Sequence, residues 1–310
     1  MKALVYSKES KQFVMQKVAT SEPKRGEVLI RVHASSINAA DYRTMKLGIG
    51  PGSGIYGADV AGTVVKVGKE VTQFAVGDAV QGDLASEGFG GFAEYVAAPE
   101  ALLGRKPATV SFETAAAVTL AGVTALQAFR LSGKDVKGKR VLIIGASGGV
   151  GTFAVQLAKH YGAEVTGVTS ERNLEQTRTI GADHMIDYHK QDCLAIGNRY
   201  DLILAVQGDA SPAEYKNALA SGGVAVVIGG ALNRVLQIMA FGWFYSLGQK
   251  RIKLLAARPD ARDTEQLMCL VAAGSIRPVI EKIVPLEETD KAFRYVASGH
   301  ASGKVVIKIV

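Results

Sequence analysis

The stretch Val141-Leu142-Ile143-Ile144-Gly145-Ala146-Ser147-Gly148-Gly149-Val150-Gly151 decides the fold of this 310-residue chain. Its leading apolar residues predict a strand buried on both faces, and the amphipathic stretch from Gly151 to Tyr161 predicts the helix that follows. Phosphate groups need close approach of the backbone and unpaired N–H donors at the start of a helix, and a glycine-rich turn in this position supplies both. The sequence therefore predicts a dinucleotide-binding turn.

Two glycines of the turn have distinct expected roles. Gly148 has no side chain to block a pyrophosphate, and Gly151 lets the helix press against the sheet. Ala146 stands where the strict pattern has its first glycine, so the fingerprint is a variant one. A turn used only for helix–sheet packing is the alternative, but three glycines within four residues exceed what packing requires. The predicted cofactor-binding residues of the turn are Ala146, Ser147, Gly148, Gly149, Val150 and Gly151.

Strands and helices continue to alternate after this turn. Further apolar strands are expected at Val165–Val168, His184–Asp187, Asp201–Val206, Gly223–Ile228 and Lys253–Ala256, with helices at about 171–180 and 213–219. Strands separated by helices in this way predict an α/β fold with a Rossmann doubly wound parallel sheet. We assign residues 119–256 to this domain.

Short β-branched segments punctuated by glycine dominate the first third of the chain. Strands are expected at Val28–Ala34, Gly62–Gly68 and Phe92–Val96, which predicts a compact β-barrel-like domain. The alternating segment Lys304–Ile309 predicts a last strand that returns to this domain after the Rossmann sheet is complete. We therefore expect a discontinuous first domain, residues 1–118 and 257–310.

The composition argues against several protein classes. The two cysteines, Cys193 and Cys269, lie far apart, which argues against a disulfide framework and a structural zinc site; both thiols are expected to be buried. The net charge of +7 is spread over scattered Lys and Arg, so no specific nucleic-acid binding is expected. Asn233 and Arg234 interrupt the apolar stretch 223–245, so no transmembrane segment is expected. The N-terminus lacks the apolar core of a signal peptide, and a cytoplasmic location is expected by default.

The choice of cofactor depends on the end of the second Rossmann strand, where an acidic side chain would hold the ribose of NAD. This chain has Thr169-Ser170-Glu171-Arg172-Asn173 there. Ser170 can donate a hydrogen bond and Arg172 can pair with a 2′-phosphate, which favours NADPH. Glu171 is the residue that would favour NAD, unless it is a solvent-facing acid in the first turn of a helix.

With these features in place, the chain resembles the quinone oxidoreductase branch of the medium-chain dehydrogenase/reductase superfamily. The matching segments are Ser36–Arg43 (SINAADYR), Gly57–Val64 (GADVAGTV), Ala121–Ala125 (AGVTA), the glycine turn running into Ala154–Lys159 (AVQLAK), Gly274–Ile280 (GSIRPVI) and Gly303–Val306 (GKVV). Their order and spacing over nearly the full length carry the resemblance. It implies a GroES-like first domain, a Rossmann cofactor domain with a cleft between the two, and a homodimer.

The resemblance also implies roles for individual residues. Asn38 and Asp41 would lie near the nicotinamide with Thr124 close by, Ile228 and Gly229 would line the nicotinamide, Tyr188 would pack near the adenosine, and Lys304 would reach the cofactor from the last strand. Each has a structural alternative: a helix cap for Asn38 and Asp41, a buried hydroxyl for Thr124, a half-buried aromatic for Tyr188, and a solvated strand residue for Lys304.

Zinc-dependent relatives need soft or imidazole ligands for a tetrahedral ion. Here Asn38 stands in the position that resembles the first ligand, and Gly57-Ala58-Asp59 stands where those relatives have Gly-His-Glu. The imidazole is missing, and the four-cysteine lobe has no counterpart between Asp83 and Pro99. We therefore expect no metal, and reduction of an already electrophilic acceptor becomes the chemically easier assignment.

The resemblance implies NADPH-dependent, zinc-free reduction of quinones or α,β-unsaturated carbonyls. Asn38, Tyr42 or solvent would supply the proton. Two alternatives remain at this stage: a reductase of enoyl thioesters, and a non-catalytic NADPH-binding structural or RNA-associated protein prompted by the basic pI of 9.3. The aromatic segment 241–245 is open to interpretation as a substrate wall, a dimer contact or a membrane-facing patch.

Overall fold

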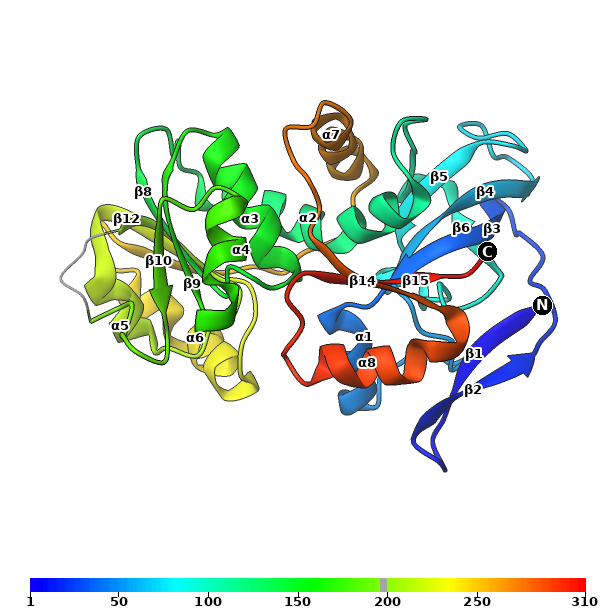
Figure 1. Ribbon diagram of the computed structural model, residues 1–310, viewed down its shortest axis with the longest axis horizontal. Helices are drawn as coiled ribbons and strands as arrows, with labels where there is room; N and C mark the ends of the chain where they lie inside the picture. The colour runs from blue at the N-terminus through cyan, green and yellow to red at the C-terminus, as the bar shows by residue number, and fades with distance from the viewer. Residues whose placement is uncertain (196–199) are drawn as a thin grey trace. The chain divides into compact units, whose positions relative to one another are not determined.

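The computed structural model describes residues 1–195 and 200–310, and the chain separates into two compact units. Unit 1 comprises Met1–Val123 and Arg258–Val310, and unit 2 comprises Thr124–Ala257. In Figure 1 the two segments of unit 1 run from blue to cyan and from orange to red, while unit 2 is green to yellow. Unit 1 is therefore discontinuous in sequence, because the chain enters unit 2 and then returns.

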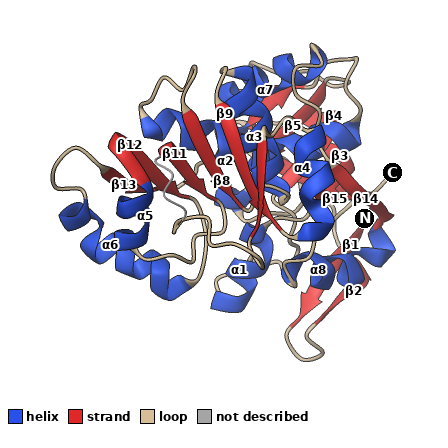
Figure 2. Cartoon of the chain, turned by 60° about the vertical axis from the view of Figure 1, so that its left-hand side comes forward, coloured by secondary structure: helices blue, strands red, loops and turns tan. Residues whose placement is uncertain are grey.

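Unit 2 contains a six-stranded parallel sheet (Figure 2). Its strands are β8 (Arg140–Ile144), β9 (Glu164–Thr169), β10 (His184–Asp187), β11 (Tyr200–Ala205), β12 (Leu219–Val227) and β13 (Arg251–Leu254), in the order β10-β9-β8-β11-β12-β13. The order reverses between β8 and β11, and in such sheets the ligand lies beyond the carboxyl ends of the strands at this reversal. The predicted doubly wound sheet is confirmed.

The helices of unit 2 differ in part from the prediction. They are α3 (Gly149–His160), the 3₁₀ turn η3 (Glu171–Asn173), α4 (Leu174–Thr179), α5 (Pro212–Ala218) and α6 (Leu232–Tyr245). The helix expected at 171–180 is a 3₁₀ turn followed by the short α4, and Asn173 between them has a non-helical backbone with φ −110° and ψ 4°. The apolar run 223–245 is divided between β12, which agrees with the strand predicted at Gly223–Ile228, and α6, which was not predicted.

Unit 1 is built on antiparallel strands. The hairpin β1 (Lys2–Ser7) and β2 (Gln12–Lys17) lies beside a seven-stranded sheet of β3 (Glu27–Ser36), β4 (Asp59–Val67), β5 (Ala79–Asp83), β6 (Tyr95–Pro99), β7 (Leu103–Arg105), β14 (Ile280–Pro285) and β15 (Lys304–Lys308). Strand β15 pairs with β14 in parallel and with β3 antiparallel. The last strand therefore does return to the first part of the chain, as predicted.

Helices and short 3₁₀ turns complete unit 1. These are α1 (Ala39–Leu47), η1 (Ala85–Glu87), η2 (Glu100–Leu102), α7 (Ala261–Ala272), η4 (Leu286–Glu288) and α8 (Thr289–Ala297). Helix α2 (Phe112–Ser132) crosses the boundary between the units and was not predicted. It is long and apolar enough to cross a membrane, but 72% of its apolar window is buried inside the protein, as is typical of a core helix. Cys269 on α7 is exposed, so the expectation of two buried thiols was wrong.

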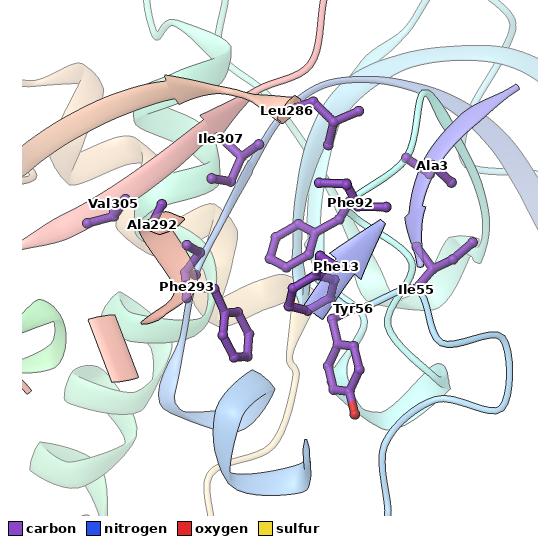
Figure 3. Close-up of a cluster of buried hydrophobic side chains, with 13 residues drawn as sticks. Ala3, Phe13, Ile55, Tyr56, Phe92, Leu286, Ala292, Phe293, Val305 and Ile307 are labelled. Atoms are coloured by element: carbon purple, nitrogen blue, oxygen red, sulfur yellow. The ribbon is translucent and has the colours of Figure 1, made fainter. Parts of the chain in front are cut away.

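An aromatic cluster joins the two ends of the chain inside unit 1. The Phe13 ring centroid on β2 lies 5.0 Å from that of Phe293 on α8 and 6.0 Å from that of Phe92. Tyr56 packs edge-on against Phe13 at 5.7 Å. Figure 3 shows these rings gathered together, with the Tyr56 oxygen pointing away from the other rings. Burial of such rings stabilises the fold by area and by edge-to-face contact, and it fixes the hairpin and α8 against the sheet.

Candidate active site

The glycine turn of unit 2 has the geometry of a phosphate cradle. A β-carbon on Gly151 would lie 2.0 Å from the carbonyl oxygen of Gly145, so glycine is required there by the packing of α3 on the sheet. At Gly148 the nearest atom to an added β-carbon is the same oxygen at 3.6 Å, an ordinary contact. Gly148 caps α3 with φ −78° and ψ 175°, which any residue can adopt. Neither packing nor backbone conformation thus demands glycine at 148, which agrees with the predicted role of this residue in close approach of a ligand to the helix N-terminus.

Ser147 ties this turn to the end of β9. Its hydroxyl accepts hydrogen bonds from Thr169 Oγ1 at 2.7 Å and from Asn173 Nδ2 at 3.1 Å. All three residues are buried. Sequence reasoning predicted Ser147 but missed Thr169 and Asn173, although both lie at the carboxyl end of a parallel strand, where polar side chains serve a site rather than the core.

The predicted adenosine-end residues lie beyond β9 and β10. The backbone N–H of Tyr188 donates to the Thr169 carbonyl at 3.2 Å, and its ring is 57% exposed. Its role near the adenosine therefore stays a prediction. Ser170 and Arg172 flank Glu171 at the start of η3.

Glu171 has a partner that the sequence analysis did not foresee. Lys190 Nζ lies 2.8 Å from Glu171 Oε1, and this hydrogen bond raises the pKa of the lysine above its ordinary value. Glu171, the acid that would favour NAD, is therefore paired with Lys190, which lies in the turn after β10. Lys190 follows Tyr188 by two residues, so the pair lies beside the predicted adenosine site.

The loops after β11 and β12 lie at the same sheet edge as the glycine turn. The N–H of Gln207 donates to the Ile144 carbonyl at 3.2 Å, and the N–H of Gly208 donates to the Gly229 carbonyl at 2.8 Å. A β-carbon on Gly208 would lie 2.5 Å from that oxygen, so the two loops approach as closely as glycine allows. Ile228 and Gly229, predicted to line the nicotinamide, are thereby held next to the end of β11, which itself lies beside β8.

Unit 1 buries a polar cluster around Lys304. The lysine is 2% exposed; its ammonium donates to Asn38 Oδ1 and lies 3.5 Å from Asp59 Oδ2. Asn38 Nδ2 donates to Asp59 Oδ2 at 2.7 Å and to the Ser36 carbonyl at 3.2 Å. Asp59 Oδ1 accepts the backbone N–H of Leu120 at 2.8 Å. The solvated-strand alternative for Lys304 is therefore wrong, because the side chain is an internal cation.

Asp41 combines a structural role with an unusual pKa. It forms a capping box with Asn38 at the start of α1, and its Oδ1 accepts the N–H groups of Gly57 at 3.0 Å and Ala58 at 3.2 Å. The capping alternative for Asn38 and Asp41 therefore describes this end of α1. Burial raises the pKa of Asp41 to about 7 against the pull of these hydrogen bonds. Burial, with the negative charge of Asp59 nearby, also raises the pKa of Asp83 to about 7.

These raised pKa values predict how stability depends on pH. Between about pH 4 and pH 7 the unfolded carboxyl releases its proton while folded Asp83 keeps it, so this contribution to stability is present at low pH and is lost as the pH rises through 7. Asp83→Asn removes the titration. We expect its free energy of unfolding, relative to wild type, to rise by about 2 kcal/mol from pH 5 to pH 8 in urea titrations.

Asp78→Asn is the matched control for this prediction. Hydrogen bonds from Ala75 N–H and Arg105 lower the pKa of Asp78, so this group adds to the stability of the wild type only as the pH rises to about 4. From pH 5 to pH 8 its carboxyl is ionised in both the folded and the unfolded state, so the free energy of unfolding of Asp78→Asn relative to wild type should not change over this range. Parallel profiles for Asp83→Asn and wild type would refute the assignment.

Two further predicted residues lie on helices α1 and α2. Tyr42 is on α1 one turn after Asn38, and its ring is partly buried under Lys46, whose Nζ lies 5.7 Å from the ring centroid. Thr124 is buried on α2, in unit 2. Asn38, Asp41 and Lys304 are therefore brought together in unit 1, and the residues from Ala146 to Gly229 lie at one sheet edge of unit 2.

The donor set of the unit 1 cluster does not suit zinc. It offers a carboxylate and an amide without imidazole or thiolate, and an ammonium already bonds both groups. Across residues 1–195 and 200–310 no three His, Cys, Asp or Glu side chains converge in a way that could hold a metal ion.

Comparison with known proteins gives matches along most of the chain. Residues 24–108 match the family described as "Alcohol dehydrogenase GroES-like domain", and residues 180–307 match "Zinc-binding dehydrogenase". A "Chloroplast envelope quinone oxidoreductase homolog" of Arabidopsis thaliana is 33% identical over 94% of this chain and 92% of its own length. An Arabidopsis "NADPH-dependent alkenal/one oxidoreductase, chloroplastic" is 32% identical over 99% and 79%.

A solved structure agrees with these sequence matches. The quinone oxidoreductase from Coxiella burnetii superposes with a TM-score of 0.87 at 28% identity, covering 100% of this chain and 98% of that one. The match spans both units, so it extends beyond the cofactor-binding sheet. The chain thus belongs to the quinone oxidoreductase branch of the medium-chain dehydrogenase/reductase superfamily and is an NAD(P)H-dependent oxidoreductase.

Proposed function

We propose that this protein is an NADPH-dependent, zinc-free reductase that transfers hydride to quinones or α,β-unsaturated carbonyls. The observation that carries the proposal is the glycine turn at the N-terminus of α3, where packing requires glycine at 151 but not at 148. The names of the two Arabidopsis relatives support the substrate class.

Different residues of unit 2 bind different parts of the cofactor. NADPH, when bound, supplies the hydride from its nicotinamide C4. Residues 146–151 bind the pyrophosphate through backbone N–H groups, and Ser147 holds the turn in place through Thr169 and Asn173. Ser170, Arg172 and Tyr188 contact the adenosine end. Ile228 and Gly229 line the nicotinamide, and Thr124 lies near it.

The unit 1 cluster supports a metal-free mechanism. The Lys304 ammonium supplies positive charge between Asn38 and Asp59, in the position that resembles the zinc ligands of other family members. Both amide hydrogens of Asn38 are donated inside the protein, so Asn38 has none left for a substrate. We therefore assign proton delivery to Tyr42 or solvent, and to Asn38 the orientation of the Lys304 and Asp59 side chains.

The ion pair of Lys190 with Glu171 leads to a prediction about cofactor choice. Because Lys190 neutralises Glu171 beside the predicted 2′-phosphate site, Lys190→Glu should repel that phosphate and reduce the preference for NADPH over NADH by roughly tenfold or more. Isothermal titration of both cofactors measures the ratio. Arg178→Glu is the matched control, because it breaks a similar exposed pair with Glu175 on α4. An unchanged ratio for Lys190→Glu would exclude a role in cofactor selection.

A direct assay tests the proposed function. Anaerobic stopped-flow mixing of the protein with NADPH and a simple naphthoquinone, or an enone, should oxidise the cofactor at a rate that saturates with acceptor. Absence of oxidation with both acceptors would defeat the proposal. Turnover of enoyl thioesters alone would favour the thioester reductase, and salt-sensitive retention on RNA without turnover would favour a non-catalytic role.

Two further parts of the proposal concern assembly and location. We propose a homodimer, since β13 pairs with β12 and stands at the edge of the parallel sheet, where a second copy can add a strand. We also retain a cytoplasmic location, although the relatives compared above are named as chloroplast proteins.

A further inference from the structure

Gln207 lies where the strand order of the parallel sheet reverses. It is the second residue after β11, and Figure 2 shows β11 between β8 and β12. The N–H groups of Val206 and Gln207 both donate to the Ile144 carbonyl at the end of β8, at 3.0 and 3.2 Å. A β-carbon on Gly145 would lie 3.3 Å from the Gln207 β-carbon, so this side chain begins beside the glycine turn. Gln207 therefore lies at the end of the sheet where a ligand is expected.

The Gln207 side chain is exposed but has a partner that orients it. Its Nε2 donates to Asp209 Oδ2 at 3.3 Å, and Asp209 Oδ1 accepts the N–H of Ala231 at 3.0 Å. Ala231 is the N-cap of α6, so Asp209 joins the loop after β11 to the loop after β12. In the parts of the chain that the structure describes, Gln207 Oε1 accepts no hydrogen bond. The amide thus keeps an acceptor for a ligand, and an oriented side chain loses less entropy on binding than a free one.

The order of the strands indicates which part of the cofactor Gln207 meets. The glycine turn follows β8, and Ile228 and Gly229, which we propose to line the nicotinamide, follow β12. Because β11 lies between these two strands, and neighbouring strands are about 4.8 Å apart, Gln207 lies between the proposed pyrophosphate and nicotinamide sites. The group that joins pyrophosphate to nicotinamide is a ribose. Its two hydroxyls donate and accept hydrogen bonds, and a carboxamide can do the same.

We propose that the Gln207 carboxamide binds the hydroxyls of the ribose next to nicotinamide, and that Asp209 is the residue that positions it. This inference rests on the proposed function, since it assigns one more side chain to the same cofactor site. An apolar side chain at 207 would leave the hydroxyls without these partners, and a carboxylate could only accept hydrogen bonds. Gln207 thereby holds the ribose, and with it the nicotinamide ring, at the carboxyl end of the sheet.

Three ligands of decreasing length test this assignment by calorimetry. NADPH contains the ribose and the nicotinamide, 2′-phospho-ADP-ribose contains the ribose without the nicotinamide, and adenosine 2′,5′-bisphosphate contains neither. Gln207→Leu should weaken binding of the first two about tenfold each, as the loss of one or two uncharged hydrogen bonds predicts, and should leave the third unchanged. Gln249→Leu is the matched control, because this exposed glutamine precedes β13 at the amino end of the strands; it should bind all three ligands as wild type does.

Every other result with Gln207→Leu overturns the assignment. Equal weakening of all three ligands would mean that Gln207 only supports the fold of the site. Weakening of NADPH alone would place its amide on the nicotinamide, and unchanged binding of NADPH would remove it from the cofactor site. If the wild-type protein binds none of the three ligands, the proposed function fails, and this assignment fails with it.

The role of Asp209 has its own test. Asp209→Ala should weaken binding of NADPH about threefold in the wild-type background and have no further effect when combined with Gln207→Leu, because Asp209 acts through the glutamine. Additive losses of affinity would show instead that Asp209 acts through its bond to Ala231, and its positioning role would be refuted.

Discussion

Gly148→Asp is expected to abolish binding of NADPH while leaving the protein folded. The position caps α3 in an extended conformation that aspartate adopts freely, and aspartate is among the preferred residues at a helix N-cap. The carboxylate would lie in the open cradle beside the pyrophosphate. Two unit charges about 4 Å apart near a protein surface repel by about 4 kcal/mol, which corresponds to roughly a thousandfold loss of affinity.

Gly148→Asn is the control, because it caps the helix equally well without the charge. It should retain more affinity than the aspartate variant, and both should unfold in urea at least as late as wild type. Calorimetry of NADPH binding measures the first difference. If Gly148→Asp bound NADPH as wild type does, the phosphate would lie elsewhere, and the assignment of residues 146–151 would be wrong.

Lys304→Met is expected to destabilise the protein by about 3–5 kcal/mol. Methionine preserves most of the volume but removes the cation, which leaves the Asp59 carboxylate in a site with no access to water. The free energy of unfolding in urea measures this loss. Lys308→Met, an exposed lysine on the same strand β15, should stay within about 0.5 kcal/mol of wild type.

A double variant tests the reason for this loss. Adding Asp59→Asn to Lys304→Met removes the uncompensated charge, so the double variant should be more stable than Lys304→Met alone. An additive or larger loss would mean that the packing of the lysine stem, rather than its charge, is what matters.

The sequence allowed a correct prediction wherever the signal was local. The run Val141–Ile144 followed by glycines fixed the strand, the turn and α3, because the required contacts lie within a few residues. The parallel strands followed from their apolar runs, since strands covered on both faces have no polar alternation. The capping of the N-terminal end of α1 was partly predicted, because Asn38 and Asp41 have the spacing of a capping box.

The burial of Lys304 could not be predicted in the same way. Its partners Asn38 and Asp59 lie 266 and 245 residues away along the chain, so no local pattern contains the ion pair. Lysine in an alternating strand favours a solvated position unless partners are known. Likewise, Glu171 could not be known to pair with Lys190, since they come from different loops.

Long apolar stretches of the sequence also did not show where a helix begins and ends. Helix α2 has a mostly apolar sequence without a clear amphipathic period, so its extent was missed. The predicted domain limits, 1–118 with 257–310 and 119–256, remain a proposal about which segments fold independently. Limited proteolysis would test them, since cleavage is expected in exposed linkers between folded domains.

The position of β15 in the sheet has a consequence for how the protein is made. The ribosome releases residues 1–123 and then 124–257 long before Lys304 leaves the exit tunnel. The parallel sheet of unit 2 is then complete in sequence, but β3 still lacks its neighbour β15, and Asp59 lacks the counter-charge of Lys304. Unit 1 can therefore finish folding only after the whole of unit 2 has been synthesised.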